Sequence, residues 1–432
     1  MNLKEFSSLN YSKNFLNSLP RKRLIENFLS LSTLQAVNYL LPLITLPYLV
    51  RVLGPEKFGL IAFAQSFVQY FIILTDYGFN LSATREISIY RDNKEKVSEI
   101  FSSVMIIKFG LMIISLLILS FLVFTISKFR NDWLVYFFTF GMVFGNVLFP
   151  VWFFQGMERM KYITILNIVA KGIFTISIFI FIRKMADYLY VPLINSMGFL
   201  IAGGLSLRIV SKDFGIKFIL PSFKAIKHQL KEGWHIFIST VASTVYMNNN
   251  IFLLGLMANN KYVGYYSAGE KIIRAATRML QPVSTTLFPF LSREFSRNYK
   301  KGLVLFFKFL KMIGIPGLLF SVSILLFSKN IVNVILGNQY FNSIVVVRIL
   351  SIIPFFGVIG NLFAYHLFIN LKLKYMIPRI LIAAFAVNLF LNLALIPFFK
   401  HIGASIALAL TEIFVPLAFI TIYLKRGRKF NV

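Results

Sequence analysis

The sequence predicts an all-α integral membrane protein with about twelve transmembrane helices in two six-helix lobes and both termini in the cytoplasm. Apolar residues make up 57% of its 432 residues and charged residues only 14%, a larger apolar share than a soluble core requires. Apolar runs of about 20 residues, each sufficient for one helical span, repeat along the chain between short polar loops. Since the alternating ten-residue segments of a membrane barrel are absent, helices are the expected spanning form.

The expected spans begin after a polar opening segment. Because its first twenty residues lack the continuous apolar stretch of a signal peptide, we expect no cleaved leader, and the first span acts as the insertion signal. The spans lie at approximately 28–50, 58–78, 100–126, 133–154, 162–182, 189–209, 234–257, 263–290, 303–327, 344–369, 377–397 and 403–424.

Lysine and arginine residues are distributed unevenly among the loops. The termini and the even-numbered loops hold 28 of them, the odd-numbered loops hold nine, and eight lie inside the expected spans. Basic residues are retained in the cytoplasm, which predicts that both termini lie there. The net charge of +29 is therefore mainly a topology signal, with some left for anionic headgroups or an anionic ligand, and no nucleic-acid partner is expected.

The two halves of the chain share short segments. Tight outer hairpins that end in glycine occur at 53–59 and 257–264, and matching segments open the fifth and eleventh spans at 160–162 and 373–375. The spacings, about 205 and 213 residues, fit one duplication, although chance similarity of turns would also produce them. Six spans in each half make the repeats parallel, which places a substrate path between two lobes.

These boundaries divide the chain into five parts. We expect a cytoplasmic N-terminal segment (1–27), an N-lobe (28–209), a basic cytoplasmic linker (210–233), a C-lobe (234–424) and a basic cytoplasmic tail (425–432).

Motifs of common enzymes and metal proteins are missing from the sequence. The chain has no cysteine, and its four histidines show no metal-ligand spacing, which excludes disulfides and thiolate metal sites. Walker, dinucleotide-binding and HExxH signatures are also absent, so no catalytic residue, metal or cofactor is expected. Energy for a transport step must then come from the substrate or from a gradient, with H⁺ or Na⁺ as candidate coupling ions.

Eight cations lie at membrane depth, where a charged side chain is costly and normally faces a wet cavity or an anionic partner. They are Lys108, Lys171, Lys271, Arg274, Arg278, Lys308, Lys311 and Arg348. We interpret that partner as the substrate. For the shallow Lys108 and Lys308, snorkelling of the ammonium toward the headgroups is an equally good explanation.

The main candidate site is a charged stripe on the eighth span. Glu270, Arg274 and Arg278 follow one another at intervals of four residues, with Lys271 alongside, so they share a helix face about 12 Å long. Guanidinium groups match phosphate oxygens in bidentate fashion, which makes this stripe a candidate phosphate site. The alternative is an internal ion-pair ladder that fixes helix packing.

Six segments in order along the chain carry a resemblance to a known family. They are Leu53–Gly59, Asp76–Glu86, Trp152–Ile163, Leu230–Trp234, Val263–Ile273 and Gly403–Glu412. In these segments the chain resembles bacterial polysaccharide flippases, most closely O-antigen translocases, of the multidrug/oligosaccharidyl-lipid/polysaccharide (MOP) exporter superfamily.

The resemblance implies a multi-pass transporter of the bacterial inner membrane that is not an enzyme. Such a protein moves an undecaprenyl-diphosphate-linked O-antigen or related polysaccharide repeat unit from the cytoplasmic to the periplasmic leaflet, as a step of lipopolysaccharide biosynthesis. Its implied partners are the lipid-linked oligosaccharide, membrane lipids, and a downstream polymerase and chain-length regulator.

A lipid-linked sugar needs cations for its diphosphate and hydrogen-bonding walls for its glycan. We expect Arg274 and Arg278 to hold the diphosphate, and Glu270 to keep Arg274 in place when the cavity is empty. The other expected substrate-binding residues are Lys271, Lys171, Lys311, Asn248, Asn249, Asn250, Gln65 and Gln69, and Asn388 and Asn392 extend the polar wall. Amide stripes of this kind can also serve only to join helices.

Three carboxyl groups are the candidates for coupling or gating. Glu412 in the middle of the last span comes first, followed by Asp76 at the cytoplasmic end of the second span and Glu270. A desolvated carboxyl at this depth can titrate near neutrality, whereas permanent pairing with a lysine would prevent it. Related carriers commonly have an acidic residue near 248–250, where this chain has three amides, which argues against cation coupling at that position.

The expected mechanism is alternating access of a cationic central cavity. Three alternatives remain: an antiporter of drugs or metabolites like those of the MATE family, a membrane-embedded polysaccharide polymerase, and a scaffold of an assembly complex. An antiporter for cationic substrates would favour acidic pockets, and a polymerase would have a large periplasmic loop, whereas the longest outer loop expected here has about sixteen residues.

Overall fold

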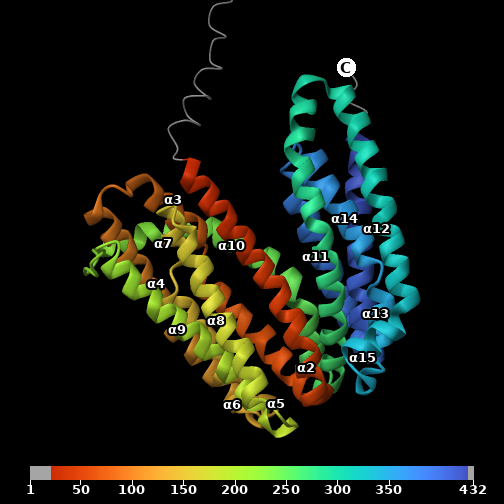
Figure 1. The fold of residues 1–432 in the computed structure, drawn as a ribbon, viewed down its shortest axis with the longest axis horizontal. Helices are drawn as coiled ribbons and strands as arrows, with labels where there is room; N and C mark the ends of the chain where they lie inside the picture. The colour runs from red at the N-terminus through yellow and green to blue at the C-terminus, as the bar shows by residue number, and fades with distance from the viewer. Residues whose placement is uncertain (1–20, 427–432) are drawn as a thin grey trace, which may run out of the picture. The chain divides into compact units, whose positions relative to one another are not determined.

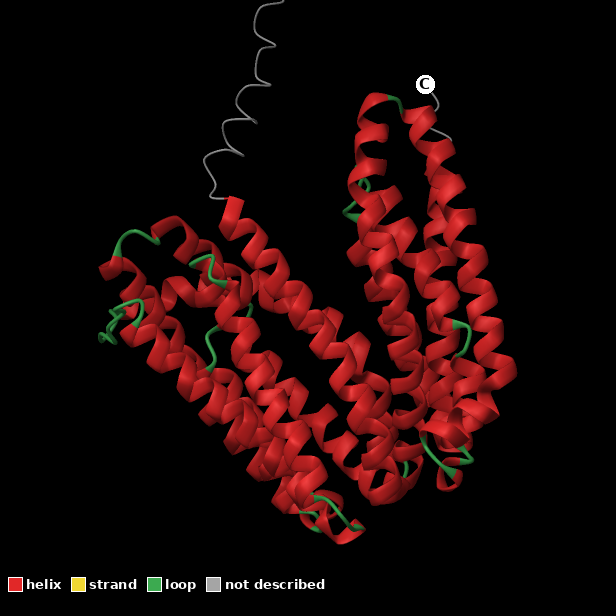
Figure 2. Cartoon of the chain, viewed as in Figure 1, coloured by secondary structure: helices red, strands yellow, loops and turns green. Residues whose placement is uncertain are grey.

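The computed structural model describes residues 21–426, apart from some helical side chains within 21–43, 239–248 and 281–286. Every regular element in the described range is a helix, as Figure 2 shows, which confirms the predicted all-α class. The chain forms two compact units, and neither is one continuous stretch of sequence. Within the described residues, unit 1 takes its members from Met1–Pro42, Phe71–Ile180 and Leu189–Ile238, and unit 2 from Leu43–Tyr70, Phe181–Tyr188 and Ser239–Val432.

The helices of unit 1 come mainly from the first half of the chain (Figure 1). They are α3 (Phe79–Tyr90), α4 (Lys94–Thr125), α5 (Ser127–Arg130), α6 (Trp133–Leu148), α7 (Val151–Gly156), α8 (Met160–Phe181) and α9 (Tyr190–Lys212), together with both ends of α2 (Arg21–Asp76) and the first turns of α10 (Phe223–Met257).

Two local signals place the beginning of this unit's helices. Gly78 has a φ of 79°, a conformation that glycine adopts without strain, and it separates α2 from α3. Asn93 caps α4 by accepting the backbone N–H of Lys96 on its side-chain oxygen at 3.0 Å. Gly78 therefore fixes where α3 begins, and the Asn93 cap fixes where α4 begins.

Close packing of α6 against α9 holds unit 1 together. A Cβ added to Gly145 would lie 2.5 Å from the Cβ of Phe199, and one added to Gly203 would lie 2.6 Å from the Cβ of Leu148. Small residues allow helix backbones to approach this closely within a membrane, where dispersion contacts drive association. Beside this pair, the side chains of Trp152, Phe153 and Phe154 on α7 are fully buried in an apolar core.

Unit 2 contains the remaining helices. They are the middle of α2, η1 (Met185–Leu189), the rest of α10, α11 (Asn260–Arg297), α12 (Tyr299–Ile335), η2 (Asn338–Tyr340), α13 (Ser343–Leu350), α14 (Ile353–Asn361), the π-helix η3 (Leu362–Phe368) and α15 (Met376–Arg426). Four phenylalanines from three of these elements form the centre of its core, namely Phe306, Phe363, Phe368 and Phe419.

The two glycine-ended hairpins of the sequence repeat meet inside unit 2. A Cβ added to Gly59 would lie 1.9 Å from the carbonyl oxygen of Asn260, and a Cβ added to Gly264 would lie 1.8 Å from that of Pro55. Each hairpin thus requires glycine because the backbone of the other is in contact with it. The α2 segment is joined further to this unit by Arg51, which donates to the carbonyl oxygen of Val334.

Eight helical stretches are long and apolar enough to cross a membrane, among the described residues. Two of the longest helices carry a break: α2 at Gly54 (φ 67°) and α15 at Lys400 (φ 51°), between the predicted spans on either side. The 51 residues of α15 would measure about 76 Å at 1.5 Å per residue, far more than one crossing of about 30 Å. The membrane assignment is confirmed, while the count of twelve and the side of each terminus stay predictions.

Candidate functional site

The charged stripe lies on α11, where Glu270 and Arg274 form an ion pair. Arg274 donates from Nε at 2.8 Å and from Nη2 at 2.6 Å, both to Oε1 of Glu270. The Glu270 side chain is 4% exposed and the Arg274 side chain 36% exposed. A buried carboxylate is stable only with a cation and hydrogen bonds, so Arg274 stabilises Glu270. The predicted contact between them is confirmed.

Two further cations of the stripe lie beside this pair. Lys271 is exposed, and its ammonium lies 4.8 Å from the centroid of the Phe58 ring, a cation–π contact. Arg278 is exposed one turn beyond Arg274. The helix therefore carries one half-exposed guanidinium anchored on a buried acid and a second, more exposed guanidinium on the same face.

A chain of amides links α10 to α15 within unit 2. Asn392 donates from Nδ2 to Oδ1 of Asn250 at 2.6 Å and to Oδ1 of Asn388 at 2.9 Å, and Asn388 donates to the hydroxyl of Thr411 at 3.2 Å. All four side chains are buried. Asn249 is buried beside them, and its Nδ2 has no hydrogen-bond partner among the described residues. Unit 2 therefore has a polar interior.

Tyr266 lies within electrostatic range of both the amide chain and the ion pair. Its side chain is fully buried in the neighbourhood of Asn250, Glu270 and Glu412, its hydroxyl has no hydrogen-bond partner among the described residues, and Glu412 also lies within electrostatic range of Arg274. Thus α10, α11 and α15 bring two carboxylates, one guanidinium, one phenol and several amides into one group. Glu412 was expected as a coupling residue, and the structure places it near the charged pair.

Sequence reasoning missed two members of this group, Tyr266 and Thr411. Tyr266 stands four residues before Glu270, on the same face of α11, and Thr411 directly precedes Glu412. Their positions next to predicted residues were a usable signal. Neither residue type is unusual in a membrane helix, however, and only the packing of three helices shows that they face the same interior.

Asp76 belongs to a different pair, in unit 1. Its Oδ1 accepts a hydrogen bond from Nζ of Lys108 at 2.9 Å, and the same ammonium lies 3.5 Å from Oδ1 of Asn146. The Lys108 side chain is 1% exposed and that of Asp76 21% exposed. Lys108 therefore does not snorkel to the surface. Of the two explanations left open for Lys108, the structure disfavours snorkelling, because a carboxylate lies within reach inside the unit.

The remaining predicted residues are spread over both units. Lys171 is half-buried on α8 in unit 1, and Lys311 is exposed on α12 in unit 2. Gln65 and Gln69 are half-buried on the α2 segment of unit 2, and the side chain of Asn248 lies outside the described residues. Lys308 is exposed, as is Arg348, whose Nε donates to the hydroxyl of Ser328 at 3.0 Å.

Comparison with known proteins gives a consistent set of relatives. The family described as "Polysaccharide biosynthesis protein" matches residues 24–295. A protein of Escherichia coli (strain K12) assigned as an O-antigen transporter is 34% identical over 390 residues, covering 90% of this chain and 94% of the relative. A protein of Shigella dysenteriae with the same assignment is 28% identical and covers 91% of this chain and 98% of its own length.

Two solved structures share the fold. A multidrug resistance MATE family transporter of the MOP superfamily, in its inward-facing conformation, superposes with a TM-score of 0.71 at 15% identity, covering 94% of this chain and all of the other. The lipid II flippase MurJ, in an inward closed conformation, gives 0.69 at 11% identity over 91% of this chain and 87% of its own. At these identities the likeness establishes the architecture.

Proposed function

The chain belongs to the polysaccharide biosynthesis protein family, and on that premise we propose that it is a flippase for a lipid-linked polysaccharide repeat unit. Its cargo would be an undecaprenyl-diphosphate-linked O-antigen or related glycan, moved from the cytoplasmic to the periplasmic leaflet of the bacterial inner membrane. Support comes from relatives assigned as O-antigen transporters and from a fold shared with a lipid II flippase.

The observation that carries this proposal is the asymmetry of the Glu270–Arg274 pair. Glu270 is buried and bound to two nitrogens of Arg274, while the guanidinium remains 36% exposed. A guanidinium has five N–H donors, so Arg274 can keep Glu270 and still bind phosphate oxygens. Arg278, one turn away and exposed, supplies a second fork. In this proposal Glu270 holds Arg274 ready between transport cycles.

Direction requires a coupling step in addition to binding. We assign it to Glu412 and its neighbours, because a change in the charge of Glu412 alters the field at Arg274, with which it interacts. Proton or sodium coupling would act through this carboxyl. Asp76 is a second candidate in unit 1, where protonation would release Lys108.

Charge reversal tests the assignment directly. The full chain is reconstituted in liposomes with a fluorescent lipid-linked oligosaccharide, and the labelled lipid that reaches the other leaflet is measured. Arg274→Glu and Arg278→Glu should each lower transport at least about a hundredfold, because the charge that faces the diphosphate then changes by two units, from positive to negative. The matched control is Arg293→Glu, an exposed arginine on the same helix, which should leave transport unchanged.

Wild-type transport in both reversal variants would overturn the assignment. If only the fold likeness to the MATE transporter reflects function, the same liposomes would instead exchange a cationic dye for protons or sodium, and the lipid-linked sugar would stay in its leaflet. The membrane insertion and thermal unfolding of the reversal variants serve as the folding check.

A further inference from the structure

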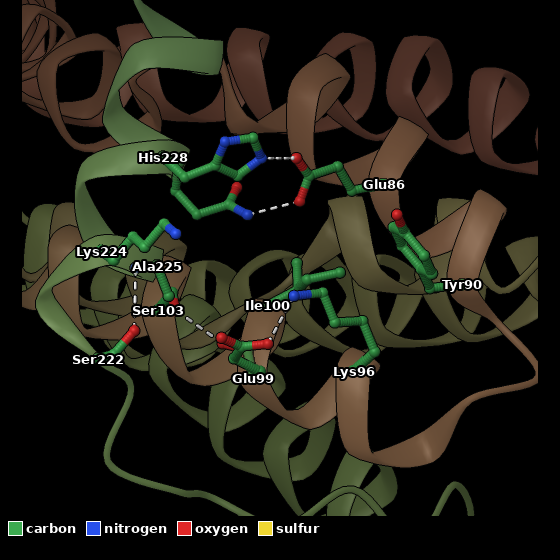
Figure 3. A pocket seen from close by; sticks show the side chains of 11 residues that line it. Glu86, Tyr90, Lys96, Glu99, Ile100, Ser103, Ser222, Lys224, Ala225 and His228 are labelled. Atoms are coloured by element: carbon green, nitrogen blue, oxygen red, sulfur yellow. Dashed lines mark hydrogen bonds and ion pairs between the residues drawn. The ribbon is translucent and has the colours of Figure 1, made fainter.

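Unit 1 contains a cavity of about 440 Å³ that has no part in the transport site (Figure 3). It lies between α3, the first turns of α4 and the first turns of α10. Figure 3 shows His228 of α10 reaching Glu86 of α3, while Lys96 and Glu99 lie on the α4 side. All of these elements belong to unit 1, so the cavity is defined within one compact part of the chain.

The acids of the cavity are already paired. Oε1 of Glu86 lies 2.7 Å from Nε2 of His228, and its Oε2 accepts the Nε2 of Gln229 at 2.6 Å. Oε2 of Glu99 accepts the ammonium of Lys96 at 2.7 Å. Lys224, which also lines the cavity, forms no ion pair with any described residue. With a neutral His228 the two acids and the two lysines of the cavity balance, and Lys224 is the cation whose ammonium has no acid partner among the described residues.

Most of the hydrogen-bonding groups of the cavity that these pairs do not use are donors. Lys224 keeps three N–H donors and Ser222, whose oxygen accepts the backbone N–H of Ala225 at 3.2 Å, keeps its hydroxyl hydrogen. One buried acceptor remains: Gln229 is 3% exposed, and its Oε1 has no hydrogen-bond partner among the residues described. A ligand with an anionic phosphate and a neighbouring hydroxyl would satisfy both kinds of group.

An extended segment beside the cavity presents apolar side chains outward. The backbone N–H groups of Lys217 and Ile219 donate to the hydroxyls of Ser98 and Ser102 on α4, at 3.3 and 3.0 Å. With its backbone held this way, the segment exposes large apolar groups on its outer side: Phe218 at 61%, Leu220 at 90% and Phe223 at 80%. Aromatic and aliphatic side chains flanked by lysines are typical of the boundary between headgroups and acyl chains.

The position of the cavity along α4 agrees with this boundary. Its lining residues on α4 lie in the first turns, before the long apolar stretch whose side chains are widely exposed. In a membrane protein that stretch faces acyl chains, so the cavity stands at the headgroup level of one leaflet.

We propose that this cavity binds the headgroup of an anionic phospholipid, with phosphatidylglycerol as the best chemical match. The phosphate contacts Lys224 and Ser222, a glycerol hydroxyl contacts Gln229, and the acyl chains lie over Phe218, Leu220 and Phe223. Basic pockets at helix ends on the cytoplasmic side are suited to anionic headgroups. The bound lipid would join α3, α4 and α10, and the assignment is independent of the cargo.

Site-specific fluorescence quenching tests the proposal. The chain has no cysteine, so Leu220→Cys labelled with bimane reports from one known position two residues from the cavity wall. The full chain is placed in phosphatidylcholine nanodiscs with increasing shares of brominated phosphatidylglycerol or brominated phosphatidylcholine. Brominated phosphatidylglycerol should give the same quenching as brominated phosphatidylcholine at a share of the total lipid that is about fivefold lower. This is the preference expected for one lysine near the surface.

Variants test whether the cavity causes the preference for phosphatidylglycerol. Lys224→Glu should abolish the preference and Lys224→Arg should keep it, while Lys231→Glu, an equal charge change on the same helix outside the cavity, should leave it unchanged. Equal quenching by both lipids, or an equal loss with Lys231→Glu, would overturn the proposal. Relief of quenching by inorganic phosphate would also overturn it, because the cavity would then take a free anion.

Discussion

Each unit of the molecule contains a buried ion pair, and these two pairs are built in opposite ways. In unit 1 the cation is buried and the acid is accessible: the Lys108 side chain is 1% exposed and that of Asp76 21%. In unit 2 the acid is buried and the cation accessible: the Glu270 side chain is 4% exposed and that of Arg274 36%. In the function proposed above, the accessible partner is the one that binds a ligand: a proton or cation at Asp76 and an anion at Arg274.

The sequence predicted the Glu270–Arg274 pair and not the Lys108–Asp76 pair, and the spacing of the partners explains this difference. Glu270 and Arg274 are four residues apart on one helix, so helix geometry alone brings them together. Lys108 and Asp76 are 32 residues apart and meet only because α4 packs beside the end of α2. A cation that looks isolated in a sequence can therefore already have its partner inside the same unit.

The largest effect is expected in unit 2, from removing the accessible partner. Arg274→Met leaves the buried Glu270 without its cation and should lower the free energy of unfolding by about 3–5 kcal/mol. Glu270→Gln leaves a guanidinium that is 36% exposed and lies within electrostatic range of Glu412, so about 1 kcal/mol is expected. Unfolding by denaturant in detergent, followed by circular dichroism, measures both. Equal losses would contradict the asymmetry described here.

A smaller effect of the same kind is expected in unit 1. Asp76→Asn leaves Lys108 buried, but the oxygen of Asn146 still faces the ammonium, so we expect a loss of about 2–3 kcal/mol. Lys108→Met leaves a carboxylate that water can reach and should cost about 1 kcal/mol. The same unfolding assay compares the two variants, and a larger loss for Lys108→Met would reverse the proposed roles.

The smallest effect concerns the amide chain, which distinguishes the interior of unit 2 from the single pair of unit 1. Asn392→Ala removes the donor shared by Asn250 and Asn388 and should cost about 1–3 kcal/mol, because the Oδ1 atoms of both are left buried without that donor. The double variant Asn250→Leu with Asn392→Leu removes both partners of one bond. It should lose less stability than the sum of its single variants, and strict additivity in a double-mutant cycle would show that the bond contributes nothing.

The local properties of this chain could be predicted from its sequence. Long apolar runs with no alternation determine a helical membrane protein, because backbone groups in hydrocarbon must be satisfied within the segment. The four-residue spacing of Glu270 and Arg274 determines their contact, since residues four apart on one helix lie on the same face. Glycines at 59 and 264 mark the two hairpins even before their packing is known.

The tertiary structure alone decided which distant residues meet. It joins Asn250 to Asn392 across 142 positions, brings Gly59 against the hairpin of Gly264, and buries Lys108 on Asp76. The apolar and polar pattern along each helix is compatible with many neighbouring helices. Periodicity therefore shows that one face of a helix is polar, but it does not show which residues pack against that face. Those partners depend on how whole helices pack, which is set by the summed contacts of many side chains and by no single motif.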